Sequence, residues 1–164
     1  MGRLVVVLAT QHELQGAEKR MGSVNDPLYT ELLEELVHAE GLDFIFEEAT
    51  GLGPTIAEKL SLSKLGPKRY LDVDPSLDER ERFGIPKVTN NPFMVGPPPD
   101  AAFADWQFHE VHAKREKFWI QRMIERDFKA ALMICGIAHG LSFTFRLQAA
   151  KFTVKTATYL KRGI

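Results

Sequence analysis

The sequence predicts an α/β fold, a three-layer α/β/α sandwich around a mainly parallel sheet of about five strands. Apolar runs of strand length alternate with segments of helical periodicity, in the order β-α-β-α-β-loop-α-β-α-β. The run RLVVVLAT at 3–10 is β-branched and does not alternate with polar residues, which is typical of a parallel strand covered on both faces. Right-handed crossovers between such strands put helices on the faces of the sheet. A chain of 164 residues fits one domain spanning 1–164.

Local signals mark the individual elements. Asp26 is suited to cap the first helix and Pro27 to occupy its first turn, and leucines then recur at helical spacing until Gly41. Pro54 opens a second helix, which runs towards Gly66. The other expected strands cover 42–49, 68–75, 130–135 and 152–159, and the other expected helices run from about 109 to 127 and from about 141 to 150.

The segment at about 88–108 is expected to be an irregular, Pro-rich insertion. It contains Asn90-Asn91-Pro92 and Gly96-Pro97-Pro98-Pro99, which are incompatible with a regular helix or strand. It is also long for a connection within a compact domain. Such a loop suits a lid over a crevice, an ordinary surface loop or a contact between copies in a homo-oligomer.

Charge and composition disfavour two classes of partner. Lys and Arg together number 21 and Asp and Glu 22, so the net charge is −1 and neither nucleic acid nor an anionic membrane is expected as a partner. The longest apolar runs, 4–9 and 130–135, are far shorter than the roughly 20 residues that span a bilayer. No basic segment with a cleavage site precedes the first run, so a cytoplasmic protein is expected. The single cysteine, Cys135, agrees with a reducing compartment.

Common catalytic and nucleotide-binding motifs are absent. The sequence has no GxxxxGK, CxxC, HExxH or GxSxG. GLGP at 51–54 follows an expected strand, but Ile56 stands where a dinucleotide fingerprint would have glycine. The usual nucleotide, zinc and serine-hydrolase interpretations therefore lack support.

Candidate functional residues follow the expected strands. Ligands of open α/β sheets bind beyond the carboxyl ends of the strands. His12 follows the first strand, Glu47-Glu48 the second and His139 the fourth. Because both faces of the second strand are expected to be buried, alternation cannot decide which of the two glutamates points into the crevice.

Other charged residues near this edge also need an explanation. Arg115 shares an apolar helical stripe with Phe118 and Trp119, so its inward guanidinium needs an anionic partner or ligand. Asp72 and Asp74 are more simply explained as turn or capping residues before the next segment. For either histidine alone, a loop or capping role is the simpler interpretation.

Four short motifs together resemble the TraB/Tiki superfamily, which includes erythromycin-esterase-like and haem-uptake ChaN-like proteins. ATQH at 9–12 resembles its G-T/E-x-H motif, with Ala9 in place of glycine, and FIFE at 44–47 resembles its strand ending in glutamate. REKFW at 115–119 resembles its helix with an arginine, and GIAH at 136–139 its GxxH. The motifs occur in the order found in the superfamily and cover about residues 4–150.

The resemblance implies a hydrolytic site made of His12, Glu47, Arg115 and His139. In Tiki-like peptidases the matching His12, Glu47 and His139 would bind a divalent Mn, Co, Fe or Zn ion, and in esterase-like members they would act in acid–base hydrolysis. Glu47 is preferred over Glu48 on the resemblance alone. In the metal-free scheme Arg115 would hold the developing oxyanion.

The predicted function is therefore metal-assisted hydrolysis of a small molecule or peptide. The alternative is a non-enzymatic domain that binds a small molecule or an anion, as a sensor or carrier. A third interpretation, an interaction subunit that docks through the Pro-rich loop, depends on a surface that sequence alone does not define.

Overall fold

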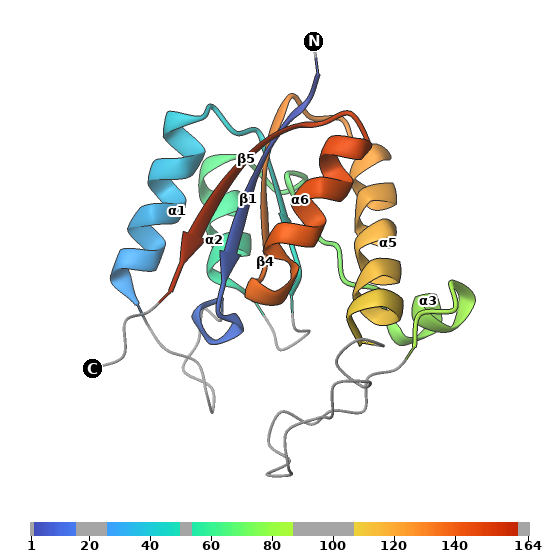
Figure 1. The fold of residues 1–164 in the computed structure, drawn as a ribbon. Coiled ribbons are helices and arrows are strands. Elements are labelled where there is room, and N and C mark those ends of the chain that lie inside the picture. The colour runs from blue at the N-terminus through green and yellow to red at the C-terminus, as the bar shows by residue number, and fades with distance from the viewer. Residues whose placement is uncertain (1, 16–25, 50–53, 87–106, 161–164) are drawn as a thin grey trace.

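The computed structural model describes residues 2–15, 26–49, 54–86 and 107–160. Five parallel strands form one sheet in the order β3-β2-β4-β1-β5 (Figure 1). The strands are β1 (Leu4–Thr10), β2 (Phe44–Glu47), β3 (Tyr70–Asp72), β4 (Ala130–Gly136) and β5 (Thr153–Tyr159). The α/β sandwich predicted from the sequence is confirmed, and each strand lies within its expected range or extends one residue beyond it.

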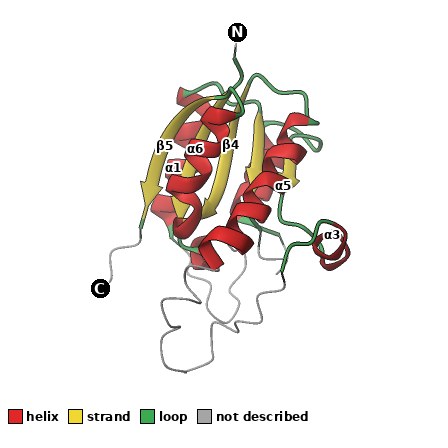
Figure 2. Cartoon of the chain, turned by 45° about the vertical axis from the view of Figure 1, so that its right-hand side comes forward, coloured by secondary structure: helices red, strands yellow, loops and turns green. Residues whose placement is uncertain are grey.

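Helices cover both faces of the sheet. On one face lie α1 (Pro27–Ala39) and α2 (Ile56–Lys64), and on the other α5 (Ala113–Ile124) and α6 (Gly140–Ala149) (Figures 1 and 2). Successive strand residues pack alternately against these two layers. In β1, for example, Val5 and Val7 belong to the core under α5 and α6, whereas Val6 and Leu8 belong to the core under α1 and α2.

The predicted helix signals correspond to observed caps. Asp26 accepts a hydrogen bond from the backbone N–H of Leu28, and Pro27 is the first residue of α1. Gly41, just beyond that helix, has φ +59°, a left-handed conformation that glycine adopts without strain. Thr55 caps α2 by accepting from the backbone N–H of Glu58. Local sequence chemistry thus fixes where these two helices start.

Two segments differ from the sequence-based expectation. The charged stretch after β3 is the short helix α3 (Leu77–Arg82), because Ser76 and Glu79 form a reciprocal capping box at its start. A π-helical turn at Gln107–His112 precedes α5, where an α-helix was expected to begin near residue 109. Most of the predicted Pro-rich insertion, residues 87–106, lies outside the described residues. Within the described ranges, no helix has both the length and the apolarity needed to cross a membrane.

The strand order creates a topological switch point between β1 and β4. The chain leaves β1 through α1 towards β2, and leaves β4 through α6 towards β5 on the opposite side of the sheet. The connections after these two neighbouring strands therefore diverge to opposite faces. Their carboxyl ends lie at the lower edge of the sheet in Figure 1. This edge is where an open α/β sheet binds ligands.

Candidate functional site

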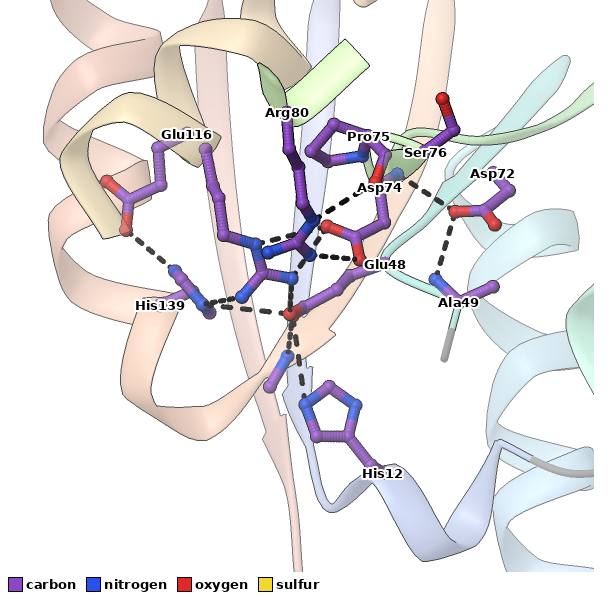
Figure 3. A network of polar contacts seen from close by, with 12 residues as sticks. His12, Glu48, Ala49, Asp72, Asp74, Pro75, Ser76, Arg80, Glu116 and His139 are labelled. Atoms are coloured by element: carbon purple, nitrogen blue, oxygen red, sulfur yellow. Dashed lines mark hydrogen bonds and ion pairs between the residues drawn. The ribbon is translucent and has the colours of Figure 1, made fainter. Parts of the chain in front are cut away.

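Three of the four predicted site residues meet at this switch point. His12 lies in the short turn η1 (His12–Leu14) after β1, and His139 in the turn η3 (Ile137–His139) after β4. Arg115 reaches them from α5. The carboxylate between them belongs to Glu48, the residue after β2 (Figure 3).

Glu48 is the centre of the cluster. Its Oε1 accepts from Nη2 of Arg115 at 2.5 Å and lies 3.7 Å from Nε2 of His139. Its Oε2 accepts from the backbone N–H of Gly136 at 2.9 Å and lies 3.9 Å from Nε2 of His12. Burial alone would raise the pKa of this carboxyl, but Arg115, the two histidines and the Gly136 amide together lower it. Glu48 is therefore a buried, ionised acceptor.

Arg115 is held by two carboxylates of the protein. Besides Glu48, it donates from Nε and Nη2 to Oδ1 of Asp74 at 3.1 and 2.7 Å. Asp74 also accepts from Arg80 through its other oxygen, at 3.0 Å. The remaining nitrogen, Nη1, makes a long contact of 3.4 Å with Nε2 of His139. The anionic partners that the sequence required for an inward arginine are thus residues of the chain itself.

The turn after β3 explains the two aspartates that sequence analysis treated as turn residues. Oδ1 of Asp72 accepts from the backbone N–H groups of Ala49 and Asp74, at 3.2 and 2.9 Å. Asp72 therefore has a turn-forming role, whereas Asp74 belongs to the ion-pair network.

His139 is fixed from its other side by Glu116. The two residues contact each other through Nδ1 and Oε1 at 2.9 Å, and Glu116 also accepts from Ser142 and Arg146. Burial opposes the ionised form of Glu116, but these hydrogen bonds and the charge of His139 hold the pKa of the Glu116 carboxyl below its usual value. An ionised carboxylate only accepts, so Nδ1 of His139 carries the proton and its Nε2 faces Arg115 and Glu48.

His12 is the most accessible member of the cluster. Its side chain is 42% exposed, compared with 3% for His139 and 4% for Glu48. Nδ1 lies 2.8 Å from Oε1 of the buried Gln15, and Nε2 points towards Glu48. Of the two histidines beside Glu48, His12 is thus the one whose ring can meet a molecule from solvent.

Glu47 lies on the opposite face of the sheet, against the α1 and α2 layer. Its Oε2 accepts from Oγ1 of Thr55 at 2.5 Å and from the hydroxyl of Tyr70 at 2.8 Å. Burial raises the pKa of Glu47 to about 7, despite these hydrogen bonds. Strand alternation explains why Glu48, and not the predicted Glu47, lies beside the histidines: the Glu47 side chain is on the same face of the sheet as Ile45, and the Glu48 side chain is on the face of Phe46.

The donor set does not fit a metal ion. The predicted ligands His12 and His139 lie on one face of the sheet and Glu47 on the other. In the described part of the chain, no three His, Cys, Asp or Glu side chains are arranged to hold an ion. Both oxygens of Glu48 are already hydrogen-bonded, and the adjacent cation is the Arg115 guanidinium. A metal would have to displace this arginine.

Two participants, Gln15 and Glu116, were missed by the sequence analysis, and Asp74 was interpreted there as a turn residue. Gln15 lies in a polar stretch with no periodic signal, so nothing in the sequence distinguishes it. Glu116 did carry a signal, because it precedes Trp119 by three residues and Met123 by seven and is buried with them on one helix face. Glu48 was left open beside Glu47.

Comparisons with known proteins give no assignment. Neither the models of known protein families nor the curated protein sequences include a match to this chain. The resemblance to the TraB/Tiki superfamily therefore remains a prediction from the four short motifs.

Proposed function

We propose that the protein is a hydrolase that uses metal-independent general-base catalysis at the switch point, with a small ester or amide as substrate. The observation that carries the proposal is the position of His12. The His12 side chain is half-exposed, and its Nε2 lies 3.9 Å from Oε2 of a buried, ionised Glu48 at the sheet edge where α/β proteins bind ligands. A general base needs a ring nitrogen with a lone pair close to the reacting water, and the nearby carboxylate stabilises the imidazolium that forms.

The chemistry assigns each residue one task. Nε2 of His12 takes a proton from water, the resulting hydroxide attacks the carbonyl carbon, and the carbonyl oxygen becomes an oxyanion. As the tetrahedral intermediate collapses, the bond to the leaving oxygen or nitrogen breaks, and the imidazolium returns the proton to that atom. Glu48 stabilises the imidazolium by its charge. Nη1 of Arg115, whose contact in the described structure is the long one to His139, is the candidate donor to the oxyanion.

The proposal is tested by an ester screen with chelator present. We expect wild-type protein to hydrolyse at least one of a series of p-nitrophenyl esters in EDTA, and His12→Gln to lower kcat about 100-fold or more. The matched control is His38→Gln, because His38 is an exposed histidine of α1 far along the chain from the cluster. Equal rates for wild type and His12→Gln across the series would overturn the proposal.

The metal-assisted version predicted from the sequence is tested separately. Elemental analysis by plasma mass spectrometry should compare tag-free wild type with His12→Ala and His139→Ala, each checked for folding by circular dichroism. A near-stoichiometric transition metal that both folded variants lose would contradict the metal-independent scheme. It would mean that Arg115 leaves Glu48 when metal binds.

The non-enzymatic alternative is less well supported in its anion-binding form. Arg115 is paired with Glu48 and Asp74, and Arg80 with Asp74. An anionic ligand would have to compete with these carboxylates for the same cations.

A further inference from the structure

Gln15 is a buried polar residue that is held by hydrogen bonds of its backbone and its side chain. Its side chain and backbone together are only 2% exposed. Its backbone N–H donates to the carbonyl of His12 at 3.1 Å, and its own carbonyl accepts from the backbone N–H of Ile56 at 2.8 Å. These two backbone hydrogen bonds alone hold Gln15 between η1 and the start of α2.

The side-chain amide has a defined orientation. Nε2 of Gln15 donates to the backbone carbonyl of Glu48 at 3.3 Å, and a carbonyl oxygen can only accept. The amide oxygen therefore faces His12, where it lies 2.8 Å from Nδ1. Because an amide oxygen also only accepts, the proton of this hydrogen bond belongs to Nδ1 of His12.

We propose that Gln15 is a positioning residue that holds neutral His12 in the Nδ1–H tautomer and leaves the lone pair on Nε2. That Nε2 then acts as the general base rests on the hydrolase proposed above, whereas the tautomer itself does not. The tautomer of His12 needs this explanation because Glu48 favours the other tautomer, with the proton on Nε2. Its Oε2 lies 3.9 Å from Nε2 and would attract a proton to that nitrogen.

Two substitutions separate this role from simple packing. Gln15→Met has nearly the same shape but replaces the amide oxygen with a thioether sulfur, which accepts only weakly, so neutral His12 should move its proton to Nε2, beside Glu48. Gln15→Glu keeps an acceptor oxygen opposite Nδ1, so it should retain the Nδ1–H tautomer. A residue that only fills space would affect the tautomer equally in both variants.

The measurement is nitrogen-15 NMR of the histidine side chains at pH 8, which distinguishes the protonated ring nitrogen from the bare one. His38, exposed on α1, serves as the internal reference in every spectrum. We expect Nδ1–H at His12 in wild type and Gln15→Glu, and loss of that tautomer in Gln15→Met. A wild-type His12 protonated at Nε2 would overturn the proposal, even if the methionine variant failed to fold. So would a folded Gln15→Met that keeps the Nδ1–H tautomer.

The same variants tell the two proposals apart. If His12 has the Nδ1–H tautomer but His12→Gln hydrolyses esters as fast as wild type, the positioning role stands and the hydrolase proposal fails. If wild type is active through His12 but the proton is on Nε2, the positioning role fails. With both correct, Gln15→Met should lower kcat about 10-fold or more with KM nearly unchanged, because only the fraction of enzyme with a free Nε2 reacts.

Discussion

At Gly136 the absence of a side chain lets two functional groups approach each other. The backbone conformation, φ −60° and ψ 150°, is one that any residue adopts, so strain does not explain the glycine. A Cβ at this position would lie 2.7 Å from Nε2 of His12 and 3.5 Å from Oε2 of Glu48. In the GxxH motif at 136–139, the glycine is therefore explained by the space that His12 needs, and the histidine by its place in the cluster.

Gly136→Ala should displace His12 without unfolding the protein. The half-exposed imidazole can rotate towards solvent, so we expect a loss of less than about 1 kcal/mol in the free energy of unfolding but at least a 10-fold fall in ester hydrolysis. Gly2→Ala is the control, because a Cβ there makes only ordinary contacts, at 3.4 Å or more. Urea unfolding and initial rates measure the two effects. Full activity in Gly136→Ala would mean that the position of His12 is not critical.

Glu47 should make the protein less stable as the pH rises from about 4.5 to about 7. Its pKa in the folded state is about 7, raised by burial, compared with an ordinary value of 4.5 in the unfolded chain. Between these values the folded state binds a proton that the unfolded state lacks, so the stabilisation is complete below pH 4.5 and is lost as the pH approaches 7. This shift corresponds to roughly 3 kcal/mol.

Glu47→Gln mimics the protonated carboxyl and should remove this pH dependence. The amide oxygen can accept from Thr55 and Tyr70, and the NH₂ takes the place of the acid proton. Urea unfolding should give equal stability for wild type and variant near pH 4.5, and a variant more stable by roughly 3 kcal/mol at pH 8. Glu34→Gln, an exposed change on α1, should show no such divergence. A variant less stable than wild type at pH 8 would mean that the ionised Glu47 is tolerated.

Between elements, the ion pairs of Arg115 tie α5 to the ends of β2 and β3. Glu48 follows β2 and Asp74 lies two residues beyond β3, and both accept hydrogen bonds from the same guanidinium. Losing one partner of a buried charge network leaves the other charges uncompensated, which costs more than the pair contributes when intact.

Arg115→Met should therefore destabilise the protein by about 3–5 kcal/mol near neutral pH. The methionine keeps much of the apolar stem but leaves Glu48 and half of the Asp74 network unpaired. Lys117→Met on the same helix is the control, because Lys117 is exposed and its loss should change stability by less than about 0.5 kcal/mol. Thermal or urea unfolding measures both. Equal stability of the two variants would show that the buried ion pairs are dispensable.

The sequence was enough to predict that the two histidines lie close together, because this prediction needed only local patterns. His12 and His139 each follow an apolar strand, and parallel strands in one sheet end at the same edge, whatever their order. Choosing between Glu47 and Glu48 required more information. The choice depends on which face of β2 lies under α5 and α6, and therefore on strand order, which is set by long-range packing. Predicting the role of Gln15 required the same tertiary information, since its hydrogen-bond partner Glu48 is 33 residues away in the sequence.

In the molecule as a whole, two apolar layers cover the sheet, and the burial of the strand residues decreases from the centre of the sheet to the β5 edge. β1 and β4 are adjacent central strands, each with six consecutive buried residues. β5 lies at one edge and has no fully buried residue between Thr153 and Tyr159. The two strands that carry His12 and His139 are thus the best-protected part of the described sheet, so the candidate site is built on its most stable region.

Amide hydrogen exchange should follow this order. Amides of β1 and β4 are expected to exchange only on global unfolding, whereas those of β5 should exchange at least 10-fold faster through local opening at the edge. Mass spectrometry of peptic fragments covering 4–10, 130–136 and 153–159 measures the difference, with the protein at low and high concentration. Slow exchange in β5 that appears only at high concentration would indicate that a second copy pairs with this edge and forms a homo-oligomer. Slow exchange at every concentration would contradict the ranking, because it would make β5 part of the same cooperative unit as the centre of the sheet.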